Sequence, residues 1–269
     1  MASFSVVNNI ASANAQTNLN VSQMGMTKAI SRLSSGFRLN QSGDDSAGLA
    51  VANKYRNDQA ILNQGIRNAN DGLSKLQIRD GALANIASLL DRMSTLATQA
   101  SNAASDADIT KLSAEYSSVA AEIDREAAVA GMTASAGFSV FVSSEATASN
   151  GKVSGTLAGV EVADLAITQT TFSTAAQAET AITQVKAAIS TLGGVQNTVG
   201  TLQNRLQFAI SLSQSQVVNT QAAESRIRDA NVAEESANMT RFNILSQAGL
   251  AALSQANQST SSVLSLLRN

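Results

Sequence analysis

Apolar residues recur at helical spacing over most of this 269-residue chain. Near the N-terminus, intervals of seven, four, three and four residues place such residues on one stripe of a helix. They are Leu19, Met26, Ile30, Leu33 and Phe37. Similar stripes run through residues 62–97, 112–127 and 202–217, and the C-terminal segment has its own apolar face. Members of that face are Phe242, Leu245, Leu253, Val263 and Leu267. The pattern predicts a mainly α-helical protein.

One helix has a well-marked beginning and end. Ser105 can cap its N-terminus, and Asp106 and Asp108 fall in its first turn, where the helix dipole favours acidic side chains. Gly131 follows its expected end, at the position where glycine commonly terminates a helix.

A second helix start and a helix break are predicted further along the chain. Thr174 and Gln177 have the spacing of a capping box. The adjacent Gly193 and Gly194 are predicted to end this helix, and a longer one is expected to begin near Val195.

The middle of the chain has a different composition. Residues 138–172 are rich in Val, Thr, Phe and Gly, and Asn150–Gly151 is a dipeptide that type I′ hairpin turns prefer. These features predict a small insert of two or three short strands. Because long helices flank the insert, we expect a long antiparallel helical coiled-coil rod with a small β-hairpin insert in its middle and the termini side by side.

The apolar stripes at the two ends allow two interpretations. Each terminal segment can pack on the other as a two-helix coiled coil. Alternatively, both segments stay disordered until a neighbouring subunit covers them. The two interpretations are compatible if folding of the ends is coupled to assembly.

Composition argues against catalysis. The chain contains no His and no Cys, which removes the usual near-neutral base, the thiolate nucleophile and the common ligands of zinc. Asp44 and Asp45 are adjacent carboxylates without a third ligand, so a solvated position or a helix-capping role is a better interpretation than a metal or acid–base site. A hydrolase using carboxylates alone would need a paired site in a cleft. We predict no enzyme activity, no cofactor and no metal.

Charge and hydropathy exclude further classes. A net charge of −2 does not favour nucleic acid, and no apolar run is long enough for a transmembrane helix. Residues 1–10 lack the basic and apolar regions of a secretory signal, which by itself predicts a cytoplasmic protein.

Motifs at both ends resemble those of bacterial flagellins. The N-terminal motifs are LSSGFRLN at 33–40, GDDSAGLA at 43–50 and QGIRNANDG at 64–72. The C-terminal motifs are SRIRDAN at 225–231, NMTR at 238–241, ILSQAG at 244–249 and QANQ at 255–258, and VLSLLR follows at 263–268. The resemblance covers roughly residues 1–130 and 195–269.

This resemblance implies a filament subunit built from the flagellin domains D0 and D1. It assigns residues 1–44 and 229–269 to the D0 coiled coil and residues 45–137 and 173–228 to the D1 rod, with 138–172 as the β-hairpin insert of D1. It also assigns polymerisation to the terminal apolar residues named above. The filament lies outside the cell, so export through the flagellar channel replaces the cytoplasmic prediction.

The resemblance also implies partners. They are further copies of the chain, the flagellar export apparatus, an export chaperone, and the hook–filament junction and cap proteins, with no nucleic acid and no membrane insertion. A flagellar junction protein or a type III secretion tip component is the alternative function, because such proteins share coiled-coil termini.

One more segment resembles a flagellin contact surface. Arg92, Leu96 and Gln99, with Glu115 on the next helix, match positions that flagellins use toward neighbouring protofilaments or a Toll-like innate immune receptor. Ser94 and Thr95 replace a charged pair common in the family, so an assembly face is the preferred interpretation.

Overall fold

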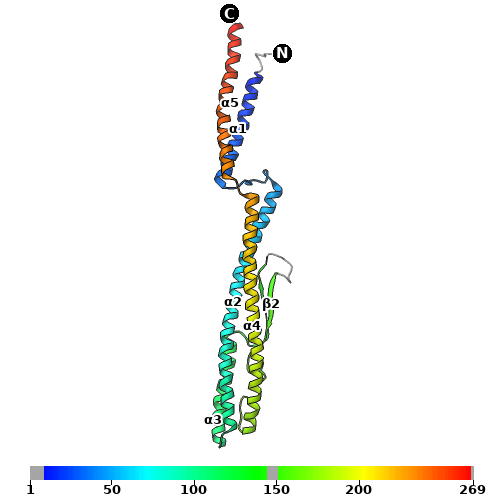
Figure 1. The fold of residues 1–269 in the computed structure, drawn as a ribbon, viewed down its shortest axis with the longest axis vertical. Coiled ribbons are helices and arrows are strands. Elements are labelled where there is room, and N and C mark those ends of the chain that lie inside the picture. The colour runs from blue at the N-terminus through cyan, green and yellow to red at the C-terminus, as the bar shows by residue number, and fades with distance from the viewer. Residues whose placement is uncertain (1–8, 144–150, 268–269) are drawn as a thin grey trace. The chain divides into compact units, whose positions relative to one another are not determined.

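The computed structural model describes residues 9–143 and 151–267, with side chains as far as residue 259. The elements follow in the order α1 (Ile10–Ser35), α2 (Ser46–Ser101), α3 (Asp106–Val129), β1 (Ala136–Phe141), β2 (Lys152–Leu157), α4 (Ala175–Arg228) and α5 (Val232–Leu267) (Figure 1). This order confirms the mainly α-helical prediction with a small β insert in the middle. Among the described residues, no helix combines the length and apolarity that crossing a membrane requires.

The chain divides into two compact units. The first comprises residues 1–57 and 220–269, and the second comprises residues 58–219. Two of the predicted D0–D1 limits fall beside helix ends, because α2 begins at Ser46 and α4 ends at Arg228. The division into D0, D1 and insert stays a prediction.

In the first unit, α1 and α5 pack side by side in antiparallel orientation. Asn9 at the start of α1 donates from Nδ2 to the carbonyl oxygen of Ala256, 3.0 Å away. Near the other end of α1, Arg32 Nη1 donates to Glu235 Oε1 over 3.1 Å. Partners therefore run in opposite directions along the two helices, and the terminal segments pair as the coiled-coil interpretation expects.

In the second unit, one hydrophobic core joins α2, α3, the hairpin and the part of α4 up to Leu206. Most positions of the predicted stripes are buried in it, including Leu76, Leu90, Ile123 and Leu202. The phenol of Tyr116 also lies in this core, where its ring meets that of Phe172 edge to face at 5.1 Å between centroids.

The β insert is a single antiparallel hairpin. Its register runs from Ala136 opposite Leu157 to Phe141 opposite Lys152. Residues after β2 form turns, and the backbone N–H of Val162 donates to the carboxylate of Asp124 in α3 over 2.8 Å. The described part of the insert has two strands. Asn150 lies outside the described residues, and the predicted turn type is therefore not placed.

The predicted helix caps are confirmed. The hydroxyl of Ser105 accepts the backbone N–H of Asp108, and Gly131 has the left-handed φ of 66° that favours glycine. At α4, the hydroxyl of Thr174 accepts from the N–H of Gln177 over 3.4 Å. The Gln177 side chain accepts the N–H of Ser173, one residue earlier than in the standard box.

The predicted break at Gly193–Gly194 is wrong. Helix α4 runs without interruption from Ala175 to Arg228, and it passes through both glycines. The flanking Leu192 and Val195 are buried in the core of the second unit, so tertiary packing holds the helix. Each glycine disfavours a helix by only about 1 kcal/mol relative to alanine, which this packing outweighs.

Replacing one of these glycines should stabilise the protein. A Cβ added at Gly194 has no neighbour within 4 Å, so Gly194→Ala should raise the free energy of unfolding by about 0.5–1 kcal/mol. Chemical denaturation of the purified monomer measures the change. At Gly65, by contrast, a Cβ would lie 2.5 Å from the carbonyl oxygen of Val142, and Gly65→Ala should destabilise by about 1–3 kcal/mol. If Gly194→Ala also lowered the free energy of unfolding, α4 would need the flexibility of glycine at 193–194.

Candidate functional site

The contact between α1 and α5 uses several of the predicted apolar residues. Leu19 is buried against Gly249, and the ring of Phe242 lies directly over Gly25. A Cβ at Gly25 would fall 2.5 Å from that ring, so the missing side chain allows the close approach of the two helices. Met26, Leu33 and Leu253 are partly buried in the first unit.

Other predicted members of the terminal stripes are not buried between α1 and α5 in the described part of the chain. Ile30 and Leu245 are 47% and 45% exposed, so their predicted place inside the coiled coil is not supported within one chain. The stripe is narrower than expected because two helices bury only the facing side of each. Val263 and Leu267 belong to α5, but their side chains lie outside the described residues.

The helix pair carries further exposed apolar side chains that the stripes did not include. On α1 these are Ile10, Val21 and Met24, and on α5 they are Val232, Ile244 and Leu250, each more than half exposed. In the sequence, these residues could have been identified as apolar positions that fall outside the predicted stripes. A surface on which several large apolar side chains are exposed together is typical of an interaction site.

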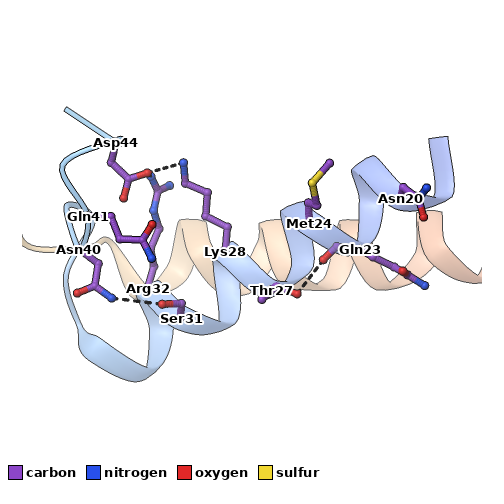
Figure 2. Close-up of a pocket in the computed structure, with 10 residues that line it drawn as sticks. All are labelled: Asn20, Gln23, Met24, Thr27, Lys28, Ser31, Arg32, Asn40, Gln41 and Asp44. Carbon is purple, nitrogen blue, oxygen red and sulfur yellow. Dashed lines mark hydrogen bonds and ion pairs between the residues drawn. The ribbon is translucent and has the colours of Figure 1, made fainter. Parts of the chain in front are cut away.

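Polar side chains line an open groove beside the end of α1. Its volume is about 820 Å³. Figure 2 shows Lys28 and Arg32 of α1 reaching toward Asp44 in the loop that precedes α2. The lining residues are Asn20, Gln23, Met24, Thr27, Lys28, Ser31, Arg32, Asn40, Gln41 and Asp44.

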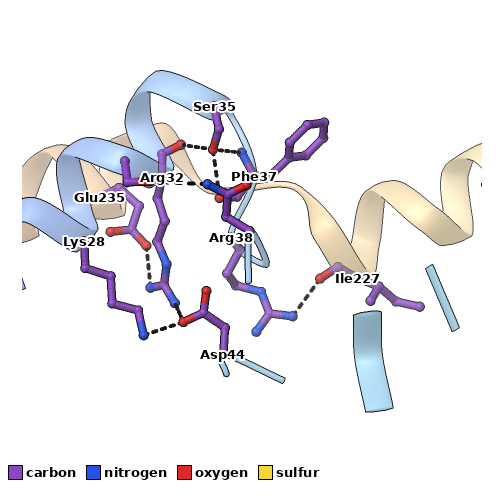
Figure 3. A network of polar contacts seen from close by, with 10 residues as sticks. Lys28, Arg32, Ser35, Phe37, Arg38, Asp44, Ile227 and Glu235 are labelled. Carbon is purple, nitrogen blue, oxygen red and sulfur yellow. Dashed lines mark hydrogen bonds and ion pairs between the residues drawn. The ribbon is translucent and has the colours of Figure 1, made fainter. Parts of the chain in front are cut away.

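Ion pairs connect this loop with α1, and α1 with α5. Lys28 Nζ lies 2.5 Å from Asp44 Oδ1, and Arg32 Nη2 lies 3.6 Å from the same oxygen. The other guanidinium nitrogen of Arg32 binds Glu235 at the start of α5 (Figure 3). The side chains of Asp44 and Glu235 are about nine-tenths buried. The Arg32–Glu235 pair, with both partners mostly buried, is better protected from solvent than an ordinary surface pair, whereas Lys28 is about half exposed.

The two adjacent aspartates have different roles. Asp45 caps α2 as predicted, because its Oδ1 accepts the N–H of Gly48 over 2.9 Å. Asp44 instead forms the ion pair with α1 described above, which the sequence did not indicate. The sequence signal was weak, since Lys28 lies sixteen positions earlier in the chain.

The motifs at 33–40 and 225–231 meet at one place. Arg38 donates from Nη2 to the carbonyl oxygen of Ile227 over 2.7 Å, which satisfies an orphan group near the C-terminus of α4 (Figure 3). The guanidinium of Arg228 stacks over the ring of Phe37 at 4.0 Å. A β-bridge pairs Phe37 with Asp229. The segment that follows α1 and the segment that precedes α5 thus bind each other.

Acid should weaken the link between Asp44 and α1. The hydrogen bond from the Lys28 ammonium holds the pKa of the Asp44 carboxyl below its ordinary value of 3.8, although burial opposes this. A lowered pKa gives stability that is present above 3.8 and is lost as the pH falls through the folded-state value. The stability difference between the wild type and Asp44→Asn should therefore shrink on acidification, as thermal unfolding at several pH values would measure. The same comparison made in a Lys28→Gln background should show a much weaker pH dependence.

The predicted contact residues on α2 and α3 are only partly available. Arg92 and Glu115 form an ion pair with both side chains about half exposed, and Gln99 is also exposed. Leu96 is 0% exposed in this chain, where it lies in the core of the second unit. Its role in a contact stays a prediction, and its burial favours a supporting position beneath the α2 face.

Both halves of the chain match family models of known proteins. Residues 6–145 match the family model of the bacterial flagellin N-terminal helical region, and residues 175–267 match that of the C-terminal helical region. A flagellin of Halalkalibacterium halodurans is 35% identical, covering 97% of this chain and 98% of that protein. The flagellar filament 31.3 kDa core protein of Treponema maltophilum is 34% identical over 93% of this chain and 95% of its own length. A crystal structure of Bacillus cereus flagellin is similar at 30% identity and a TM-score of 0.47, over 59% of this chain and 94% of that one.

Proposed function

Because the chain belongs to the bacterial flagellin family, the structural proteins of the flagellar filament, we propose that it leaves the cell unfolded and folds at the growing filament tip. Its role is structural and not enzymatic. The single observation that carries self-assembly is the exposed apolar surface on both terminal helices, where Met24 and Ile244 are 65% and 61% exposed. Burial of such area against further copies stabilises a polymer.

Small residues make part of this surface suitable for close helix packing. Val21 and Leu245 flank an open groove of about 440 Å³ in the first unit. Ala15, Ala248, Gly249 and Ala252 also line it, so the helix backbones are accessible to a neighbouring helix. We assign this surface to D0, formed by 1–44 and 229–269, and the remaining helices to D1 with the 138–172 insert.

The composition supports export in the unfolded state. A chain without Cys cannot form cross-links on the way, and one without Pro avoids isomerisation steps that last tens of seconds. The export apparatus, an export chaperone, and the junction and cap proteins are the corresponding partners. The names of the relatives, flagellin and filament core protein, favour a filament subunit over a junction protein or secretion tip component.

We place the exposed Arg92–Glu115 pair and Gln99 in a protofilament contact. A Toll-like receptor contact is the second use of the same face. Arg92→Ala should impair polymerisation and leave receptor signalling unchanged if the face serves assembly only. Reduced signalling by the monomeric variant would favour the receptor.

Electron microscopy of the purified chain tests the proposed function. The wild type should form long homopolymers, and Ile244→Ser should not, because serine removes apolar area from the terminal surface. Val129→Ser is the matched control, since Val129 is 72% exposed but lies in the second unit. Export is tested separately, by following secretion of the wild-type chain in cells with and without a working flagellar export apparatus. Wild-type chains that only cap or join other filaments would overturn the subunit role.

A further inference from the structure

We propose that the outer edge of strand β1 binds an extended acidic peptide segment of another protein, which adds to the hairpin as a third strand. Such binding is separate from the proposed filament function and does not depend on it. Two features of the second unit support it, namely the unpaired backbone along this edge and the charges of the groove beside it.

The register of the hairpin determines which backbone groups of β1 point away from β2. The N–H of Val142 donates to the carbonyl oxygen of Gly151, which continues the register of the hairpin, over 2.8 Å. Because bonded and non-bonded pairs alternate along an antiparallel ladder, every second residue back from Val142 also bonds with β2. The residues between them, Gly137, Ser139 and Phe141, therefore direct their N–H and C=O groups to the opposite edge.

These outward groups have no hydrogen-bond partner in the described part of the chain. On the matching edge of β2, by contrast, Arg205 Nη1 donates to the carbonyl oxygen of Ser154 over 3.0 Å. Ser154 is the register partner of Ser139, so equivalent positions differ, with a partner on β2 and none on β1. An unpaired strand edge is a template for a further strand.

An open groove of about 460 Å³ runs along the β1 edge. Its lining includes the five consecutive residues 137–141. Side chains of a strand alternate between its two faces, so five consecutive residues beside one groove indicate that the backbone edge itself faces it. The other wall is α2, where a Cβ at Gly72 would lie 2.8 Å from Val140 and 3.3 Å from Phe138. The groove therefore has room for an extended chain between β1 and α2.

The α2 wall of this groove has an excess of positive charge. It carries Lys75 and Arg79 against the single anion Asp71. Arg79 donates to the carbonyl oxygen of Gly131 over 3.3 Å, and this neutral acceptor leaves its charge uncompensated. The side chains of Lys75 and Asp71 form no ion pair or hydrogen bond within the described residues. Charge complementarity therefore favours an acidic occupant.

The hairpin of a second copy does not fit this requirement. Strand β1 reads AGFSVF and has no charged residue, and β2 reads KVSGTL and would add a cation. Pairing the edges of two copies would leave the positive charge of the groove uncompensated. The favoured occupant is a segment of a different protein with acidic residues at alternate positions, because alternate side chains of an added strand would face α2.

Peptide binding to the purified full-length monomer tests this site. The probe is a fluorescein-labelled peptide of sequence TVEVEVT, and its fluorescence anisotropy should rise and saturate at low salt. The matched peptide TVKVKVT should bind about tenfold more weakly, because lysine is repelled by the groove. A TVEVEVT probe that shows no saturable binding would overturn the proposal.

Two N-methylated versions of the acidic peptide separate strand pairing from simple charge attraction. One is methylated at the odd positions and the other at the even positions, so both keep the two glutamates. Only one set of N–H groups can face β1, and methylation removes those donors. One version should therefore lose binding while the other retains it. Equal affinity of the two versions would exclude strand addition.

Substitutions in the chain locate the binding site. Lys75→Glu should weaken binding of TVEVEVT about tenfold, whereas Lys186→Glu, the same charge change at an exposed position of α4, should not. Ser139→Pro removes an outward N–H but no ladder hydrogen bond, and should abolish binding. Ser154→Pro, at the register partner on β2, should leave binding unchanged.

Thermal unfolding shows whether the two proline variants keep the wild-type fold, and the Lys75→Glu comparison does not depend on them. Wild-type affinity in Lys75→Glu would contradict the site. A wild-type chain that forms filaments but binds no acidic peptide would overturn this site and leave the filament function standing. A chain that binds the peptide but forms no filaments would overturn only the filament function.

Discussion

Deleting residues 232–269, and with them α5, should leave a helical monomer that forms no filaments. The core that joins α2, α3, the hairpin and α4 lies within residues 58–219, so most helical signal should survive. Without α5, α1 loses the partner that covers Leu19, and an isolated helix of this length is marginal in water. The surface that we assign to polymerisation would then no longer be folded.

Circular dichroism and electron microscopy of the same sample measure this result. A deletion of residues 1–35 should behave in the same way, since it removes the other half of the pair. An internal control is the Val129→Ser variant, which keeps both terminal helices. Filaments grown from either deletion would contradict the coupling of terminal folding to assembly.

Reversing the charge of Glu235 should have the largest effect of any single substitution in the helix pair. Its side chain is 9% exposed and accepts from Arg32, whose second nitrogen faces Asp44. Glu235→Lys places a buried cation against a guanidinium, and removing one partner of a buried ion pair costs about 3–5 kcal/mol. We expect α1 and α5 to separate and filament growth to stop.

Glu234→Lys provides the matched control. Glu234 is exposed in the same first turn of α5, so both substitutions change the net charge equally and both oppose the helix dipole. Thermal unfolding of the two variants should therefore differ by the lost ion pair together with the cost of burying a lysine beside Arg32. An equal loss of stability in Glu235→Lys and Glu234→Lys would show that the Arg32–Glu235 contact contributes little to the stability of the helix pair.

Much of the fold follows from local rules that the sequence displays. The caps at Ser105 and Thr174 depend on residues three positions apart, and they appear in the structure as predicted. The helical periodicity of residues 62–97 and 112–127 gives α2 and α3 one core face each, because successive turns of a helix bury the same side. The family resemblance likewise depends on contiguous motifs at both ends of the chain.

Local rules do not predict features that depend on contacts between residues distant in the sequence. The Gly193–Gly194 pair is a breaker by propensity, but buried neighbours on either side keep α4 helical. Asp44 was indistinguishable from Asp45 in the sequence, and only the return of the loop toward α1 gives it Lys28 as a partner. Periodicity also does not show which apolar residues of α1 face α5. The stripe predicts Ile30 in the helix pair, but its side chain is 47% exposed.

By itself, the sequence determined the helical architecture, the place of the β insert and the flagellin family, because these depend on periodicity and contiguous motifs. Only the tertiary structure decided that residues 36–38 bind residues 227–230, that Glu235 pairs with Arg32, and that Phe208 stays uncovered. These facts join positions up to about two hundred residues apart. Such contacts are selected by packing and by burial of charge, which no local pattern encodes.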